Sequence, residues 1–318
     1  MFSKITSFIM GIVTFVLSLL GISIGKDDPA PKMPELKTYV EDGLLFMDNV
    51  PYGNDAQQTV DIIIPENTAG ETSLFFHIHG GAWVGGDKSY GKELAVAAAK
   101  KYNIVGVTID YRLLANKRGN HRLSCKTLLE DIDNAMKAVR ETCLEKGITL
   151  KSALVRGDSA GGHLALLYSY LYKNSSPVHI GLVESNCGPT DLTDRNYLQK
   201  DWAISRKDMM KLYGALIGKD VYLINYGTKD VQQKLWAVSP CCYVSADVPA
   251  TIFSSSGKDV LVPVSNGDRL DEMLNAVGVD HYYTCFDYGT HCCRDALDAE
   301  KSDAYDDMFE KMMAKYVL

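Results

Sequence analysis

Hydrophobic residues recur along the chain from about Lys37 in two alternating patterns. Short apolar runs rich in β-branched residues, such as Thr59–Pro65 and Ile104–Leu113, are typical of buried strands. Longer segments, such as residues 125–146, place apolar residues at helical spacing. Strands that alternate with helices predict βαβ units, and hence a mostly parallel sheet with helices on both faces. We therefore expect an α/β domain over residues 37–318.

Other short apolar runs continue this pattern toward the C-terminus. We expect further strands over residues 73–79, 153–156, 179–185, 250–257 and 281–289. Residues 189–240 interrupt the alternation with helix-like pieces and aromatic residues, over a length too great for a plain connection. We interpret this segment as a helical insertion over one end of the sheet, or alternatively as an ordinary helix pair packed at its edge.

Residues 1–25 differ in character from the rest of the chain. Within them, residues 5–25 are uncharged and mostly apolar, which is about the length that spans a bilayer. A polar, Pro-rich linker follows over residues 26–36. We interpret the segment as a signal peptide cleaved after Ser23–Gly25, or as an uncleaved anchor that attaches the protein to a membrane. In both cases we expect the domain to be extracellular, secreted or membrane-anchored, and outside the cytoplasm.

The charge balance argues against nucleic acid as the main partner. Lys and Arg total 33 against 40 Asp and Glu, the net charge is −7, and no long basic run occurs. A chain with 46% hydrophobic and 23% charged residues is typical of a globular protein with a well-filled core. The sequence gives no indication of the oligomeric state.

The eight cysteines form no regular framework. Neighbours such as Cys241–Cys242 would be strained if they were bridged to each other. We expect no metal site, because neither CxxC nor paired HxxxH spacing occurs. Since an exported chain permits disulfides, we expect mostly buried thiols with one or two bridges.

A glycine-flanked serine stands between a predicted strand and a predicted helix. Residues Gly157–Gly161 match G-x-S-x-G, with the apolar run 153–156 before them and helix-forming residues after them. Such a turn presents the serine oxygen beyond the sheet and is so crowded that glycines are needed at its flanks. The helix also directs its N-terminal amides toward the point where negative charge would develop. Ser159 is therefore the candidate nucleophile.

A serine nucleophile needs a histidine base, and that base needs a carboxylate to orient it. In α/β hydrolases, which the G-x-S-x-G turn between a strand and a helix resembles, the acid and then the histidine follow the serine along the chain, each on a loop after a strand. His291 alone has that order and setting, just after the strand run 281–289. Asp259 directly follows the run 250–257 and is the candidate acid, while Asp287 is a rival that lies close before His291.

The residues HGGAW at 79–83 suit the stabilisation of an oxyanion. Glycine reaches positive φ and lets another group approach the backbone N–H, and a tetrahedral oxyanion needs two or three such donors. We expect donors from Gly81, Ala82 and Ala160, with Gly80 shaping the turn or sharing the role. Trp83 is a candidate wall of the substrate-binding pocket, although a core aromatic fits the pattern equally well.

Five motifs in this order resemble the hormone-sensitive-lipase-like branch of the α/β hydrolases, near bacterial acetyl-xylan and feruloyl-type esterases. They are HGGAW at 79–83, DYRL at 110–113, GDSAGGHLAL at 157–166, GKDVLVP at 257–263 and YGTH at 288–291. The resemblance covers most of residues 37–318. It implies an α/β-hydrolase fold with an eight-stranded sheet, a triad of Ser159, Asp259 and His291, and no cofactor.

The resemblance also implies an activity, which is the hydrolysis of short-chain carboxylic esters through an acyl-enzyme. The chain departs from the usual pattern in two places, with Ala82 at the third position of HGGG and Cys-Cys after His291 where Gly-Phe is common. We expect small acyl or acetyl esters as substrates, free or linked to polysaccharide. The alternatives are an amidase of arylformamidase or peptidase type on the same triad, and a non-catalytic ligand-binding protein on the same fold.

Overall fold

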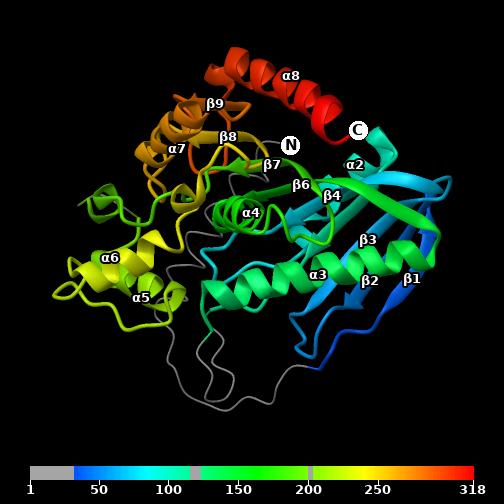
Figure 1. Cartoon of the computed structure of the whole chain (residues 1–318), viewed down its shortest axis with the longest axis horizontal. Helices are drawn as coiled ribbons and strands as arrows, with labels where there is room; N and C mark the ends of the chain where they lie inside the picture. Colours follow the sequence, from blue (N-terminus) through cyan, green and yellow to red (C-terminus); the bar gives the residue numbers. More distant parts are fainter. Residues whose placement is uncertain (1–31, 115–122, 200–202) are drawn as a thin grey trace.

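The computed structural model describes residues 32–114, 123–199 and 203–318 (Figure 1). The apolar segment 5–25, expected to be a signal peptide or an anchor, lies outside these residues. Within the described ranges no helix is both long enough and apolar enough to cross a membrane.

The described residues form a sheet of nine strands in the order β1-β2-β3-β5-β4-β6-β7-β8-β9. The strands β1 to β3 and the pair β3–β5 run antiparallel, and every neighbouring pair from β5 to β9 is parallel. The bounds are β1 Lys37–Glu41, β2 Leu44–Pro51, β3 Thr59–Pro65, β4 Gly70–Ile78, β5 Val105–Ile109, β6 Ile148–Asp158, β7 Ile180–Asn186, β8 Ala250–Ser256 and β9 His281–Phe286. The mostly parallel α/β sheet expected from the pattern is thus confirmed.

The sheet has one strand more than the eight implied by the resemblance. The additional edge strand is β1, whose five side chains are all exposed. It pairs with β2 through the backbone and through a stack of Tyr39 on Phe46, with 4.9 Å between the ring centroids. Because no residue of β1 is buried, it carries no hydrophobic pattern that could have revealed it.

Helices cover both faces of the sheet. The helices α3 (Cys125–Glu145), α4 (Ala160–Leu171) and α7 (Val264–Val277) share one hydrophobic core, and α2 (Ser89–Tyr102) and α8 (Ala299–Tyr316) share the other. Consecutive strand residues alternate between the two cores, as Phe75 and Phe76 of β4 do. Strands buried on both faces explain the near-continuous apolar runs in the sequence.

The described residues of the segment 189–240 contain two α-helices, α5 (Arg206–Leu216) and α6 (Lys229–Trp236). Figure 1 shows them together at the end of the molecule opposite the β1–β2 edge. Short 3₁₀ turns flank them at Arg195–Leu198 and Pro240–Tyr243, and a third 3₁₀ turn, Ala296–Asp298, precedes α8.

All eight cysteines lie in the described part of the chain, and all are free. The expected disulfide bridges are therefore wrong, whereas the expected burial is found in half of the thiols: Cys125, Cys143, Cys187 and Cys241 are buried. The count and sequence positions of cysteines do not fix which side chains face each other, so they could not decide this point.

Candidate active site

Ser159 stands on a sharp turn between β6 and α4. Its φ of 55° and ψ of −123° lie in a region that non-glycine residues rarely adopt. A Cβ on Gly157 would lie 2.3 Å from the Gly161 backbone, and one on Gly161 would lie 2.1 Å from the Ile78 oxygen. The Ser159 amide donates to the Asn186 carbonyl at 2.8 Å. A side chain at Gly157 or Gly161 would overlap the neighbouring backbone, so both positions require glycine.

The structure brings three candidate residues together at the carboxyl ends of three strands. His291 Nε2 lies 2.8 Å from Ser159 Oγ, and His291 Nδ1 lies 2.7 Å from Asp259 Oδ2. The other Asp259 oxygen, Oδ1, accepts from the amides of Leu261 at 2.7 Å and Val262 at 3.0 Å. These amides fix the carboxylate, so it presents one oxygen to the imidazole and holds the ring toward the serine.

The rival acid Asp287 and two other histidines have other partners. Asp287 pairs with Lys301 at 2.7 Å and is largely exposed, and His281 pairs with Asp271 at 3.0 Å. His163 Nε2 donates to the Val238 carbonyl at 2.7 Å. Burial lowers the pKa of His163 to about 4, against the opposing effect of that backbone bond, so its ring is neutral.

The electrostatic setting of His291 favours its charged form. Burial alone lowers the pKa of the imidazole, but the charge and hydrogen bond of Asp259 outweigh burial and raise it to about 9. The group is thus well suited to take up a proton from Ser159, because its protonated state is stabilised in place.

Asp158, which directly precedes Ser159, is held by ion pairs and a hydrogen bond. Its carboxylate contacts Arg156 and His77 at 3.3 Å and accepts from Asn186 Nδ2 at 3.1 Å. Burial raises the pKa of Asp158, but Arg156 and His77 overcome this and hold it well below its usual range. Asp158 is therefore an ionised anchor beneath the turn that carries Ser159.

The HGGAW loop packs directly against this turn. Gly81, Ala82 and Trp83 all have positive φ, at 118°, 50° and 62°. A Cβ on Gly80 would lie 2.7 Å from the Asp158 oxygen, and one on Gly81 would lie 2.1 Å from the Gly85 oxygen. Among the described residues, no acceptor takes the amide hydrogens of Gly81 and Ala82. These amides are available to a bound group.

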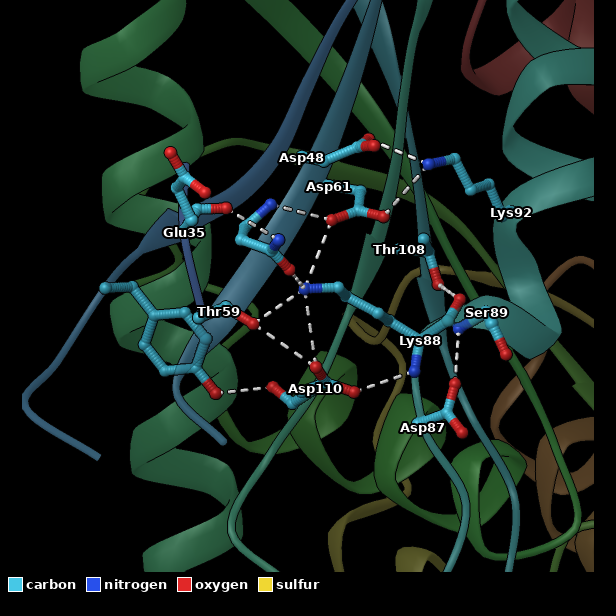
Figure 2. A network of polar contacts seen from close by, with 12 residues as sticks. Glu35, Asp48, Thr59, Asp61, Asp87, Lys88, Ser89, Lys92, Thr108 and Asp110 are labelled. Carbon is cyan, nitrogen blue, oxygen red and sulfur yellow. Dashed lines mark hydrogen bonds and ion pairs between the residues drawn. The ribbon is translucent and has the colours of Figure 1, made fainter. Parts of the chain in front are cut away.

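The two ends of this loop are held by buried contacts. At its start the rings of His79 and Tyr111 stack with 4.2 Å between centroids, and Tyr111 Oη donates to the His79 carbonyl at 2.9 Å. Five residues after Trp83, Lys88 lies at the centre of the network in Figure 2. Its ammonium donates to Asn49 Oδ1 at 2.6 Å and Thr59 Oγ1 at 2.7 Å.

Acidic residues complete the Lys88 network. The ammonium lies 3.1 Å from Asp61 and 3.4 Å from Asp110, and the Lys88 amide donates to Asp110 Oδ1 at 2.7 Å (Figure 2). Removing a buried cation from such a cluster leaves uncompensated carboxylates and typically costs about 3–5 kcal/mol. Lys88 was not expected to matter for the site. Its partner Asp110 belongs to the DYRL motif, which is the one signal that could have pointed to it.

An apolar hollow of about 50 Å³ opens beside Ser159. Ser159, Ala82, Trp83 and Ala160 all line it, so four of the expected residues border it. Trp83 is both a wall and a largely buried residue, and its Nε1 donates to His163 Nδ1 at 3.2 Å. Much of the remaining wall comes from the 189–240 segment: Pro189, Leu192, Tyr197, Ile204, Met209, Leu212 and Tyr213.

Comparison with known proteins gives a family match and a set of structures with the same fold. The sequence model of the BD-FAE family matches residues 60–274. Esterase B from Lactobacillus rhamnosis superposes with a TM-score of 0.68 at 16% identity, covering 99% of this chain and 95% of that one. A truncated carbohydrate esterase from gut microbiota gives 0.65 at 18% identity, with 85% and 99% coverage.

One curated relative is similar over a limited region. It is a probable isoprenylcysteine alpha-carbonyl methylesterase of Arabidopsis thaliana, 26% identical over 117 residues. The match takes in 37% of this chain and 23% of the relative, so the chain spans about a quarter of the relative's length.

Proposed function

Because the chain belongs to the BD-FAE family of hormone-sensitive-lipase-like α/β hydrolases, we propose that it is a serine esterase that cleaves short-chain carboxylic esters. The observation that carries the proposal is the unbroken hydrogen-bonded chain from Asp259 through His291 to Ser159, with contacts of 2.7 and 2.8 Å. The fold is that of the carboxylesterase-type hydrolases, and this chain of contacts supports Ser159 as the nucleophile and His291 as its base.

In the proposed mechanism Ser159 Oγ attacks the ester carbonyl while His291 Nε2 takes its proton. Asp259 holds the ring in the required tautomer and stabilises the imidazolium that forms. The imidazolium then gives the proton to the departing alcohol, leaving an acyl group on Ser159. Water, activated by the same imidazole, attacks this acyl-enzyme and releases the acid.

The tetrahedral intermediates carry a negative oxygen that the protein must stabilise. We assign this role to the amides of Gly81, Ala82 and Ala160, with Gly80 packing the loop against the Ser159 turn. The support is that Ala82 and Ala160 border the hollow beside Ser159 and that no acceptor in the described part of the chain takes the amide hydrogens of Gly81 and Ala82. Removing one such donor typically costs about 3 kcal/mol of transition-state stabilisation.

The hollow favours a small acyl group. A water molecule needs roughly 10–15 Å³ of such space, so a hollow of about 50 Å³ suits a group of only a few heavy atoms. Its lining is almost entirely apolar, which fits acetyl to butyryl chains. We propose a small molecule or an acylated polysaccharide as the alcohol part, since one protein with this fold is a carbohydrate esterase.

A chain-length series tests this proposal. We expect p-nitrophenyl acetate and butyrate to be hydrolysed with much higher kcat/KM than the octanoate ester, because the longer chain exceeds the hollow. The matched p-nitroanilide of acetic acid is expected to react far more slowly, since an amine leaves less readily than a phenolate. Anilide turnover at a rate near that of the ester would instead favour the amidase alternative, and no turnover of any ester would exclude the esterase.

The pH dependence of kcat/KM is expected to reflect His291. Only the neutral imidazole can accept the serine proton, and the pKa of His291 is raised to about 9. Activity should therefore rise with pH through an inflection above the ordinary histidine value of 6.5. In Asp259→Asn the carboxylate charge that raises the pKa is gone, so the inflection should move to lower pH while the rate falls.

Asp287→Asn is the matched control for this pH profile, because it removes an exposed carboxylate that pairs with Lys301. Its inflection should coincide with that of the wild type. An Asp259→Asn profile with an unmoved inflection would contradict the assignment of Asp259.

A further inference from the structure

Two cysteines lie against the imidazole of His291. Cys187 directly follows β7, and Cys292 directly follows His291 on the loop after β9. One ligand atom from each of Cys187, His291 and Cys292 lies within 4.8 Å of the others. Cys187 and His291 are buried, and Cys292 is partly exposed. The sequence spacing did not indicate this cluster, because Cys187 lies on a loop far along the chain from the adjacent pair His291 and Cys292.

We propose that Cys187, His291 and Cys292 form a binding site for a thiophilic divalent cation of the Zn²⁺ type, and that occupation of this site inhibits the enzyme. Two thiolates and one imidazole are ligands that such ions prefer, and three protein ligands leave a fourth tetrahedral position for water. The effect on activity rests on the proposed esterase function, whereas the binding itself does not.

The present contacts of the three groups explain why an ion would inhibit. Both ring nitrogens of His291 are engaged, one with Asp259 and the other with Ser159. Coordination through either nitrogen breaks one of these bonds, so the serine loses its base or the base loses its orientation. Inhibition should therefore affect kcat and should not depend on the length of the acyl chain.

The thiols of Cys187 and Cys292 have polar contacts that a bound metal ion would replace. Cys292 Sγ donates a long bond of 3.6 Å to the Asn186 carbonyl, and Cys187 Sγ lies 3.3 Å from Ser256 Oγ. Binding replaces two S–H bonds with two metal–sulfur bonds and releases two protons to solvent, with no change in oxidation state. A disulfide between the same residues would require the two sulfurs to approach to about 2.05 Å, whereas an ion can bridge them at a larger separation.

Zinc titration of single-cysteine variants tests the site. Zn²⁺ binding is measured by calorimetry, and p-nitrophenyl acetate hydrolysis is measured in parallel, with a non-thiol reductant present throughout. We expect the wild type to bind one ion and to lose activity, and EDTA to restore it. Cys187→Ser and Cys292→Ser should bind Zn²⁺ at least about tenfold more weakly, since even indirect partners of a metal ligand cost that much, and should need correspondingly more Zn²⁺ for half-inhibition of their own Zn²⁺-free activity.

Cys293→Ser is the matched control, because it alters the neighbouring cysteine outside the cluster and should behave as the wild type does. His291→Ala should also weaken binding, which calorimetry reports although this variant is inactive. Equal Zn²⁺ affinity and inhibition in the wild type, Cys187→Ser and Cys292→Ser would overturn the proposal, as would the absence of binding to the wild type. If the protein hydrolyses no ester, the calorimetric comparison still decides the site on its own.

Discussion

Ser159→Ala is expected to abolish ester hydrolysis, with kcat falling by about six orders of magnitude. The variant removes the only atom that can form the acyl-enzyme, and members of a catalytic triad act as a unit. It keeps the Cβ, so the unusual backbone at φ 55° is no more strained than in the wild type. The measurement is kcat on p-nitrophenyl acetate, together with the thermal midpoint to show that the fold is intact.

Ser169→Ala is the matched control for this experiment. Ser169 lies on α4, the helix that begins directly after Ser159. Its side chain is fully buried, and its hydroxyl has no hydrogen-bond partner among the described residues. We expect this variant to keep its activity and to react with a fluorophosphonate probe as the wild type does. Labelling of Ser159→Ala at the wild-type rate, or retention of most of its activity, would refute the assignment.

His291→Ala should reduce kcat nearly as much as the loss of the serine. Without the imidazole, Ser159 Oγ loses the base at 2.8 Å that takes its proton and returns it to the leaving alcohol in the proposed mechanism. His281→Ala serves as the control, since His281 pairs with Asp271 and is not bonded to the serine. The assignment of the base fails if His291→Ala hydrolyses p-nitrophenyl acetate at a rate close to normal.

The sequence carries strong local signals for the candidate triad. Gly157 and Gly161 are dictated by contacts with neighbouring backbone, so the motif around Ser159 reports the geometry of the turn itself. Asp259 and His291 each follow an apolar strand run, and parallel strands bring their carboxyl ends to the same edge of a sheet. Chain order and strand position therefore favoured Asp259 and His291, although Asp287, which also stands between Ser159 and His291 in the chain, remained a rival.

Features that depend on contacts between distant parts of the chain could not be predicted from local sequence patterns. The edge strand β1 has no buried residue, so hydrophobic periodicity could not reveal it. Lys88 meets Asp61 and Asp110 only because β3 and β5 are neighbours in the folded sheet. The cluster of Cys187, His291 and Cys292 likewise arises where the loops after β7 and β9 converge. None of these features produces a recognisable spacing of residues in the sequence.

The lining of the hollow and the candidate triad come from different parts of the chain, and this separation has an evolutionary consequence. Most of the lining belongs to the segment 189–240, whereas the candidate triad of Ser159, His291 and Asp259 lies elsewhere in the chain. Insertions and substitutions in that segment can therefore diversify the substrates accepted by descendants of this protein while the chemical machinery is inherited unaltered.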